Sequence, residues 1–162
     1  MSTMVTDRSA AAMKTRRFPV WAKIVVAVVS LLAVFGIAML VKMNYVPAAL
    51  DTSTSALSAE QRFRASYQPD IEAIPINQIH TWTLHVEDAN GQPVEDATIR
   101  VDGGMPQHGH GLPTAPQVTE YLGNGDYRAE GMKFNMSGWW VITLDIDANG
   151  ASDRVTYNLV LD

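Results

Sequence analysis

The sequence predicts an all-β fold, an immunoglobulin-like antiparallel β-sandwich of about seven strands, preceded by one N-terminal transmembrane helix. Two observations predict this architecture. An uncharged apolar run extends from residue 24 to residue 41, and after residue 60 apolar and polar residues alternate in several short segments with turn signals between them. No amphipathic helix pattern is evident after residue 60. A chain of 162 residues suits one such domain with an appendage.

Residues 18–42 are expected to form the transmembrane helix. Ile24–Val41 carries no charge, and the apolar residues from Phe18 to Ala22 extend it to a length that can cross a hydrocarbon core of about 30 Å. The basic segment 1–17 is expected to be a cytoplasmic tail by the positive-inside rule. This predicts a single-pass protein of a bacterial inner (cytoplasmic) membrane with a periplasmic C-terminal domain. The alternative is a signal peptide that is cleaved near Ala48.

Residues 43–61 are expected to be a linker, because they are mostly small and polar and show no periodicity. Residues 62–162 are expected to form the sandwich. Three Asn-Gly pairs, at positions 90, 124 and 149, lie between strand candidates and predict hairpins. The alternation predicts that Trp82, Ile99, Trp140, Leu144 and Leu159 are buried in one core.

The charge distribution and the missing residue types exclude several functions. Residues 1–42 carry six basic residues and one acidic residue, whereas the rest carries six basic and sixteen acidic residues. So acidic a domain argues against nucleic-acid binding. The absence of cysteine excludes disulfides, thiolate metal sites and thiol catalysis. No nucleophile, phosphate-loop or metalloprotease motif is present, so the protein is expected not to be an enzyme.

The segment 103–116 differs from the scaffold around it. It contains four Gly, three Pro and no charged residue, and it is expected to be irregular. In an extended chain His108 and His110 would point the same way, and imidazole suits copper and zinc. Three methionines are candidate soft ligands that would favour Cu(I): Met105, Met132 and Met136. The alternatives are an ordinary loop histidine pair and methionines that fill gaps in the core.

Several motifs in residues 62–161 resemble the YtkA-like domain, which is also grouped with FixH-like proteins. The most specific is M-P-x-H-x-H-G-x-P-T, beginning at Met105; others are D-x-x-G-x-P-V-x-D-A-x-I, L-G-x-G-x-Y and G-M-x-F-x-M-x-G-x-W. The resemblance implies a small, membrane-anchored or secreted β-sandwich. It also implies a role in copper handling or in the maturation of respiratory oxidases, with Met105, His108 and His110 as the residues to follow.

Two functions are compatible with these features. The first is a periplasmic copper-binding domain that delivers copper to a receiving protein or a respiratory assembly protein. The second is a non-catalytic accessory or assembly subunit whose His-rich loop is a protein contact surface. No cofactor other than copper is expected.

The charge asymmetry and the apolar run generate a topology prediction. A reporter fused after Asp162 should be active in the periplasm, and the protein should stay in the membrane fraction after a carbonate wash. Release of a soluble product that begins near Ala49 would instead show that the leader is a cleaved signal peptide.

Overall fold

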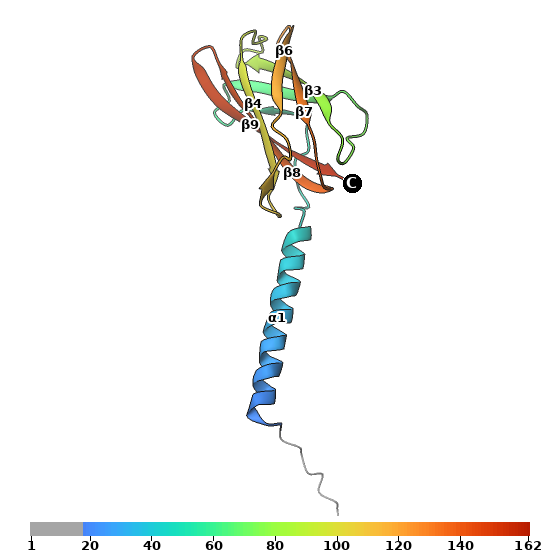
Figure 1. Ribbon diagram of the computed structural model, residues 1–162. Coiled ribbons are helices and arrows are strands. Elements are labelled where there is room, and N and C mark those ends of the chain that lie inside the picture. The colour runs from blue at the N-terminus through green and yellow to red at the C-terminus, as the bar shows by residue number, and fades with distance from the viewer. Residues whose placement is uncertain (1–17) are drawn as a thin grey trace, which may run out of the picture. The chain divides into compact units, whose positions relative to one another are not determined.

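A computed structural model describes residues 18–162 as one apolar helix and a β-sandwich (Figure 1). The basic segment 1–17, expected as a cytoplasmic tail, lies outside the described residues. Contacts divide the chain into two compact units, the first ending at Leu40 and the second beginning at Val41. Each unit is described by itself.

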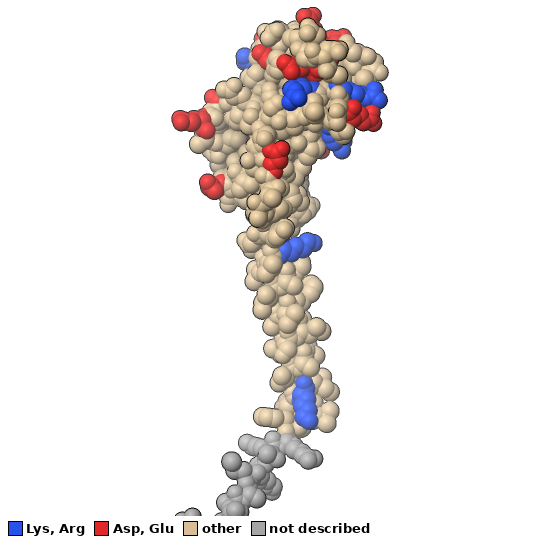
Figure 2. Space-filling model, turned by 180° about the vertical axis from the view of Figure 1, so that it is seen from behind, with Lys and Arg blue, Asp and Glu red and all other residues tan. Residues whose placement is uncertain are grey.

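The helix α1 spans Val20–Asn44, close to the expected 18–42. It begins directly after Pro19, whose carbonyl accepts hydrogen bonds from the amides of Ala22 and Lys23. Its most apolar 18-residue window has a mean hydropathy of 3.0 and no buried residue. In Figure 2 its surface is tan apart from blue lysine atoms near its ends. The helix is long and apolar enough to cross a membrane, a property that N-terminal signal sequences share.

The second unit contains two antiparallel sheets. Five strands form the first sheet, in the spatial order β1 (Ser55–Leu57), β2 (Phe63–Pro69), β3 (His80–Asp88), β7 (Asp126–Met132) and β6 (Gln117–Gly123). Four strands form the second sheet, in the order β5 (His110–Gly111), β4 (Thr98–Met105), β8 (Gly138–Ala148) and β9 (Ala151–Leu161). The described chain therefore has nine strands rather than about seven, because two very short edge strands, β1 and β5, are added.

The core lies between the inner faces of the two sheets, as the alternation predicts. Every second residue of β3 and β8 is buried, and Trp82, Leu144 and Trp140 are inaccessible to solvent. Ile99 belongs to the same core, whereas Leu159 is only partly buried against it. The two sheets also meet through aromatic rings, since Tyr67 of β2 packs edge-on against Tyr157 of β9 with ring centroids 4.9 Å apart.

Two of the three Asn-Gly pairs form hairpins. Asn124-Gly125 joins β6 to β7 and Asn149-Gly150 joins β8 to β9, with positive φ at all four residues. That backbone suits the right-handed twist of paired strands. Asn90-Gly91 differs: it only folds the chain back onto β3, where the amide of Val94 donates to the carbonyl of Val86 at 2.9 Å. The chain then crosses to the other sheet as β4.

Part of the segment expected to be a linker belongs to the sandwich. β1 pairs with β2, and the Asn158 side chain donates a hydrogen bond to the carbonyl of Asp51 at 3.0 Å. The Trp139 indole in turn donates to the Asn158 side-chain oxygen at 3.0 Å. These are long-range hydrogen bonds, which residue periodicity does not reveal.

The contrast between the two neighbouring tryptophans gives a stability prediction. Trp140→Ala should lower the free energy of unfolding by about 3–5 kcal/mol, because it removes a large buried aromatic side chain. Trp139→Ala is the matched control and should cost clearly less, since Trp139 is only half-buried. Urea unfolding followed by near-ultraviolet circular dichroism measures both. Equal losses would contradict the assignment of Trp140 to the core and Trp139 to its margin.

Candidate metal-binding site

The His108/His110 segment is an ordered hairpin and not an irregular loop. β4 continues through Gly103 and Gly104 to Met105, and the chain returns as β5 after a tight turn. The carbonyl of Met105 accepts hydrogen bonds from the amides of His108, at 3.1 Å, and Gly109, at 2.9 Å. Gly109 has φ of +70°, a conformation that costs glycine little. The turn therefore fixes where both histidines leave the backbone.

The two imidazoles lie next to each other. The ring centroids of His108 and His110 are 5.7 Å apart, with 28° between the ring planes. His110 is exposed and His108 is half-buried, so both side chains can change rotamer. Two nitrogens bound at about 2.0 Å to one ion are at most about 4 Å apart, which small rotations of these rings can achieve. The hairpin thus brings together two of the residues predicted from the sequence.

Gly104 determines how closely β5 lies against β4. A Cβ atom on Gly104 would be 2.8 Å from the carbonyl oxygen of His110 and 3.5 Å from the Cα of Gly111. Real Cβ atoms do not approach backbone so closely, so any side chain here would push the hairpin outward. Glycine at position 104 therefore allows His110 to lie close to the sheet.

Trp140 connects the hairpin to the turn that carries Met136. The Trp140 ring meets the His110 ring edge-on, with centroids 6.2 Å apart. Its indole nitrogen donates a hydrogen bond to the carbonyl of Met136 at 3.1 Å. Met136 is 37% exposed, so its thioether can still bind a ligand.

The other two candidate methionines are buried in the core. Met105 is the strand partner of His110, but its side chain is only 2% exposed and its methyl group packs against Gly138. Met132 is inaccessible to solvent and pairs with His80 across β3 and β7. Among residues 18–162 no group of three or more His, Cys, Asp or Glu side chains could hold a metal ion. A metal at the His pair would therefore need a thioether or water to complete its coordination.

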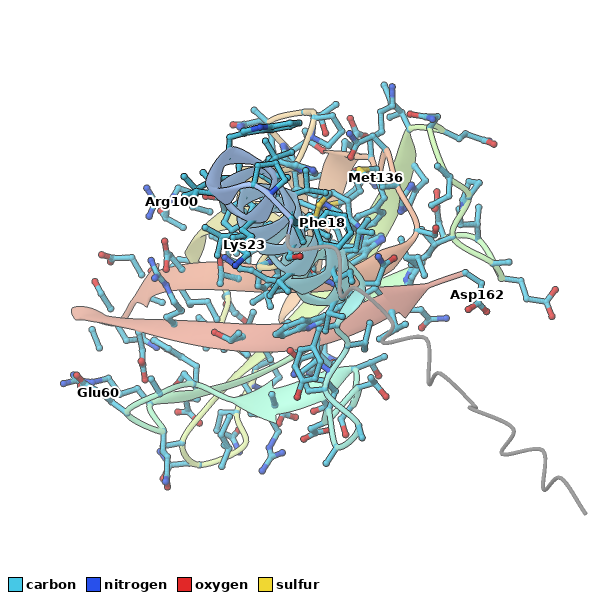
Figure 3. The ribbon with its side chains drawn as sticks, turned by 90° about the horizontal axis from the view of Figure 1, so that it is seen from below. Phe18, Lys23, Glu60, Arg100, Met136 and Asp162 are labelled. Atoms are coloured by element: carbon cyan, nitrogen blue, oxygen red, sulfur yellow. The ribbon has the colours of Figure 1, made fainter. Side chains whose placement is uncertain are left out.

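Two carboxylates of the sandwich are engaged by basic side chains, whereas the exposed Asp102 lines a surface hollow together with Gly104 and His110. Asp145 bonds to Arg100 and Arg154, and these hydrogen bonds lower its pKa to about 2. Arg100 and Met136 lie towards opposite ends of the second sheet (Figure 3). His85 is half-buried and its Nδ1 lies 2.7 Å from Asp126. Asp145, Asp126 and His85 all lie outside the 103–111 segment.

His80 is a residue whose chemistry the sequence did not reveal. It opens β3, it is only 6% exposed, and its Nε2 has no hydrogen-bond partner. Its burial could have been found, because His80 continues the alternating series Trp82, Leu84 and Val86. The lack of a hydrogen-bond partner for Nε2 could not have been predicted, because it depends on how the side chains pack in three dimensions.

The close contact at Gly104 gives a prediction about the hairpin. Gly104→Ala should loosen β5, so that the amide of Leu112, which donates to the carbonyl of Gly103 at 3.0 Å, exchanges its hydrogen about tenfold faster or more. Gly91→Ala strains a turn elsewhere, since Gly91 has φ of +76° with open space around it, and should leave that rate unchanged. NMR hydrogen exchange measures both rates. Unchanged exchange in Gly104→Ala would contradict the role given to this glycine.

Comparisons with solved structures find three chains of low sequence identity. A DUF4426 family protein from Pseudomonas aeruginosa PAO1 is 12% identical with a TM-score of 0.47, over 67% of this chain and 96% of that chain. The Lin-41 filamin domain is 14% identical with a TM-score of 0.38, over 65% and 96% of the two chains. The ZirS C-terminal domain is 12% identical with a TM-score of 0.35, over 70% and 82%. No curated protein matches the chain significantly.

A family model decides the identity of the domain. The model for YtkA-like proteins matches residues 61–145, a range that includes the Met105–Thr114 motif, the buried Trp140 and most of the strands. This match spans more than half of the chain. The chain belongs to the YtkA-like family.

Proposed function

We propose that this YtkA-like protein is a membrane-anchored, periplasmic copper-binding domain with His108 and His110 as its principal ligands. The observation that carries the proposal is the pair of adjacent imidazoles, 5.7 Å apart, on a hairpin whose backbone is fixed by hydrogen bonds and by the close contact at Gly104. Preorganised ligands lose less entropy on binding than ligands on a free loop. The α1 helix would serve as the anchor.

The available third ligand is Met136. Of the three methionines proposed from the sequence, it alone is exposed, and the Trp140 indole bonds to its backbone while contacting His110. Two neutral nitrogens and a thioether add no negative charge to the site. That donor set suits copper, and Cu(I) in particular, better than a hard divalent cation.

The surrounding electrostatics support the capture of a cation. Residues 43–162 carry sixteen acidic and six basic side chains, so their field concentrates cations near the domain. The segment 103–111 is itself uncharged, and the nearest carboxylate in sequence, Asp102, accepts a hydrogen bond from the amide of Gly103. Transfer to a copper-receiving or respiratory assembly protein is consistent with ligands that lie at the surface.

Copper titration of the full-length protein in detergent micelles tests this proposal. One Cu(II) ion should bind and give an electron paramagnetic resonance spectrum with nitrogen couplings from two imidazoles. The double variant His108→Ala, His110→Ala should lower the affinity by about a hundredfold or more, because both nitrogen ligands are lost. His85→Ala, which removes a histidine that bonds to Asp126, is the control and should leave the affinity unchanged.

Further outcomes separate the alternatives. Met136→Leu should weaken Cu(I) binding while leaving Cu(II) binding nearly unchanged, since a thioether is a soft ligand. Affinity should fall on acidification, because imidazole must lose its proton to bind a metal. Unaltered Cu(II) binding by the double variant would overturn the assigned ligands. Failure of the intact protein to bind copper would favour the function of the hairpin as a protein contact surface.

A further inference from the structure

A second pair of donors lies inside the sandwich, where His80 meets Met132. His80 opens β3 and is directly opposite Met132 at the end of β7. Both side chains are on the inner face: His80 is 6% exposed and Met132 is inaccessible. Opposed residues of antiparallel strands have Cβ atoms about 5 Å apart, so the two side chains leave the backbone next to each other.

The His80 ring has an unused nitrogen in this interior. Nδ1 lies 3.3 Å from the carbonyl oxygen of Gln78, to which it can only donate a hydrogen bond. Nε2 then carries the free lone pair, and it is buried with no hydrogen-bond partner. Buried polar atoms are nearly always satisfied, so this one requires an explanation. A backbone carbonyl that accepts from the far nitrogen is also the usual support for a metal-binding histidine.

The surroundings of His80 are aromatic and uncharged. The Phe134 ring centroid is 5.8 Å from that of His80, and the Trp82 centroid is 6.3 Å away. Such a site would strongly disfavour a divalent ion, because nothing in it offsets the charge. A soft monovalent ion costs less to bury, binds thioether sulfur and gains from neighbouring ring faces.

We infer that His80 Nε2 and the Met132 thioether form an interior site for Cu(I), separate from the His108/His110 pair. The identity of the metal rests on the proposed function, but the ligands are different residues on the other sheet. The two sites lie at the same end of the sandwich, because Phe134 contacts both His80 and Trp140, and Trp140 contacts His110. Copper taken up at the surface pair would have this deeper, softer site beneath it.

Silver titration of the full-length protein in detergent tests the interior site, with Ag(I) as a probe that mimics Cu(I) and does not change oxidation state. The protein carries ¹³C-labelled methionine methyl groups and the His108→Ala, His110→Ala substitutions, so the surface pair is absent. One equivalent of Ag(I) should still bind and shift the Met132 methyl resonance. Adding Met132→Leu, which keeps the side-chain volume, or His80→Phe should weaken this binding at least about tenfold.

The controls make each outcome decisive. His85→Phe replaces a histidine of the same strand that is not at the site and should leave Ag(I) binding intact. Because Met132→Leu changes little in shape, it gives an answer even where His80→Phe impairs folding. Ag(I) binding that neither substitution weakens, or a Met132 methyl resonance that does not move, would overturn the inference and leave a buried water as the partner of Nε2.

The failure of this inference and the failure of the proposed function would look different. One nitrogen and one thioether form a poor Cu(II) site, so the interior pair should be silent in the Cu(II) spectrum that reports His108 and His110. Absence of the Cu(II) signal from the intact protein would contradict the surface site alone. Absence of the Ag(I)-induced shift of the Met132 methyl resonance would contradict the interior site alone.

Discussion

The burial of Trp140 is the interaction on which both the core and the candidate site depend. Its indole is inaccessible and packs edge-on against Phe134, with ring centroids 5.1 Å apart. A buried indole needs apolar contacts on its faces and an acceptor for its N–H. The Met136 carbonyl supplies the acceptor, and the His110 ring supplies a contact at the surface end. The geometry of the hairpin is therefore set by core packing as well as by the turn itself.

The sandwich could be predicted because its longest strands are half-buried and alternate strictly. In β3 and β8 the period of two is uninterrupted, and the Asn-Gly turns that end β6 and β8 confirm the hairpin prediction. Prediction failed where an element is too short to show a period. β1 has three residues and is held by long-range hydrogen bonds such as that from Asn158 to Asp51, and no local pattern encodes such a bond.

The candidate site could be predicted only in part: the order of the 103–111 segment and the burial of Met132 both have causes that composition does not reveal. The count of Gly and Pro suggested an irregular loop, yet Ile99, Val101, Gly103 and Met105 continue one alternating series that leads Met105 into the core. The burial of Met132 is harder to predict, because a β-bulge lies around Gly131, which has φ of +85°. The bulge reverses the face of the sheet on which the next residue lies. Tyr127 and Ala129 are both buried, so strict alternation without the bulge would place Met132 on the outer face.

The acidic side chains of the domain and the neutral donors of the candidate site are different residues. This arrangement would let an acidic domain discriminate among cations. Carboxylates attract all cations, and the oxygen ligands they offer favour calcium and magnesium. Here Asp145 is bound to two arginines and Asp126 to His85, so these two carboxylates are already engaged. The hairpin presents the neutral nitrogens of His108 and His110, and the exposed thioether is that of Met136, which precedes β8. Under the proposed function, long-range attraction is thus unselective, while binding at short range would depend on softness and would favour copper over the harder ions that the same field attracts.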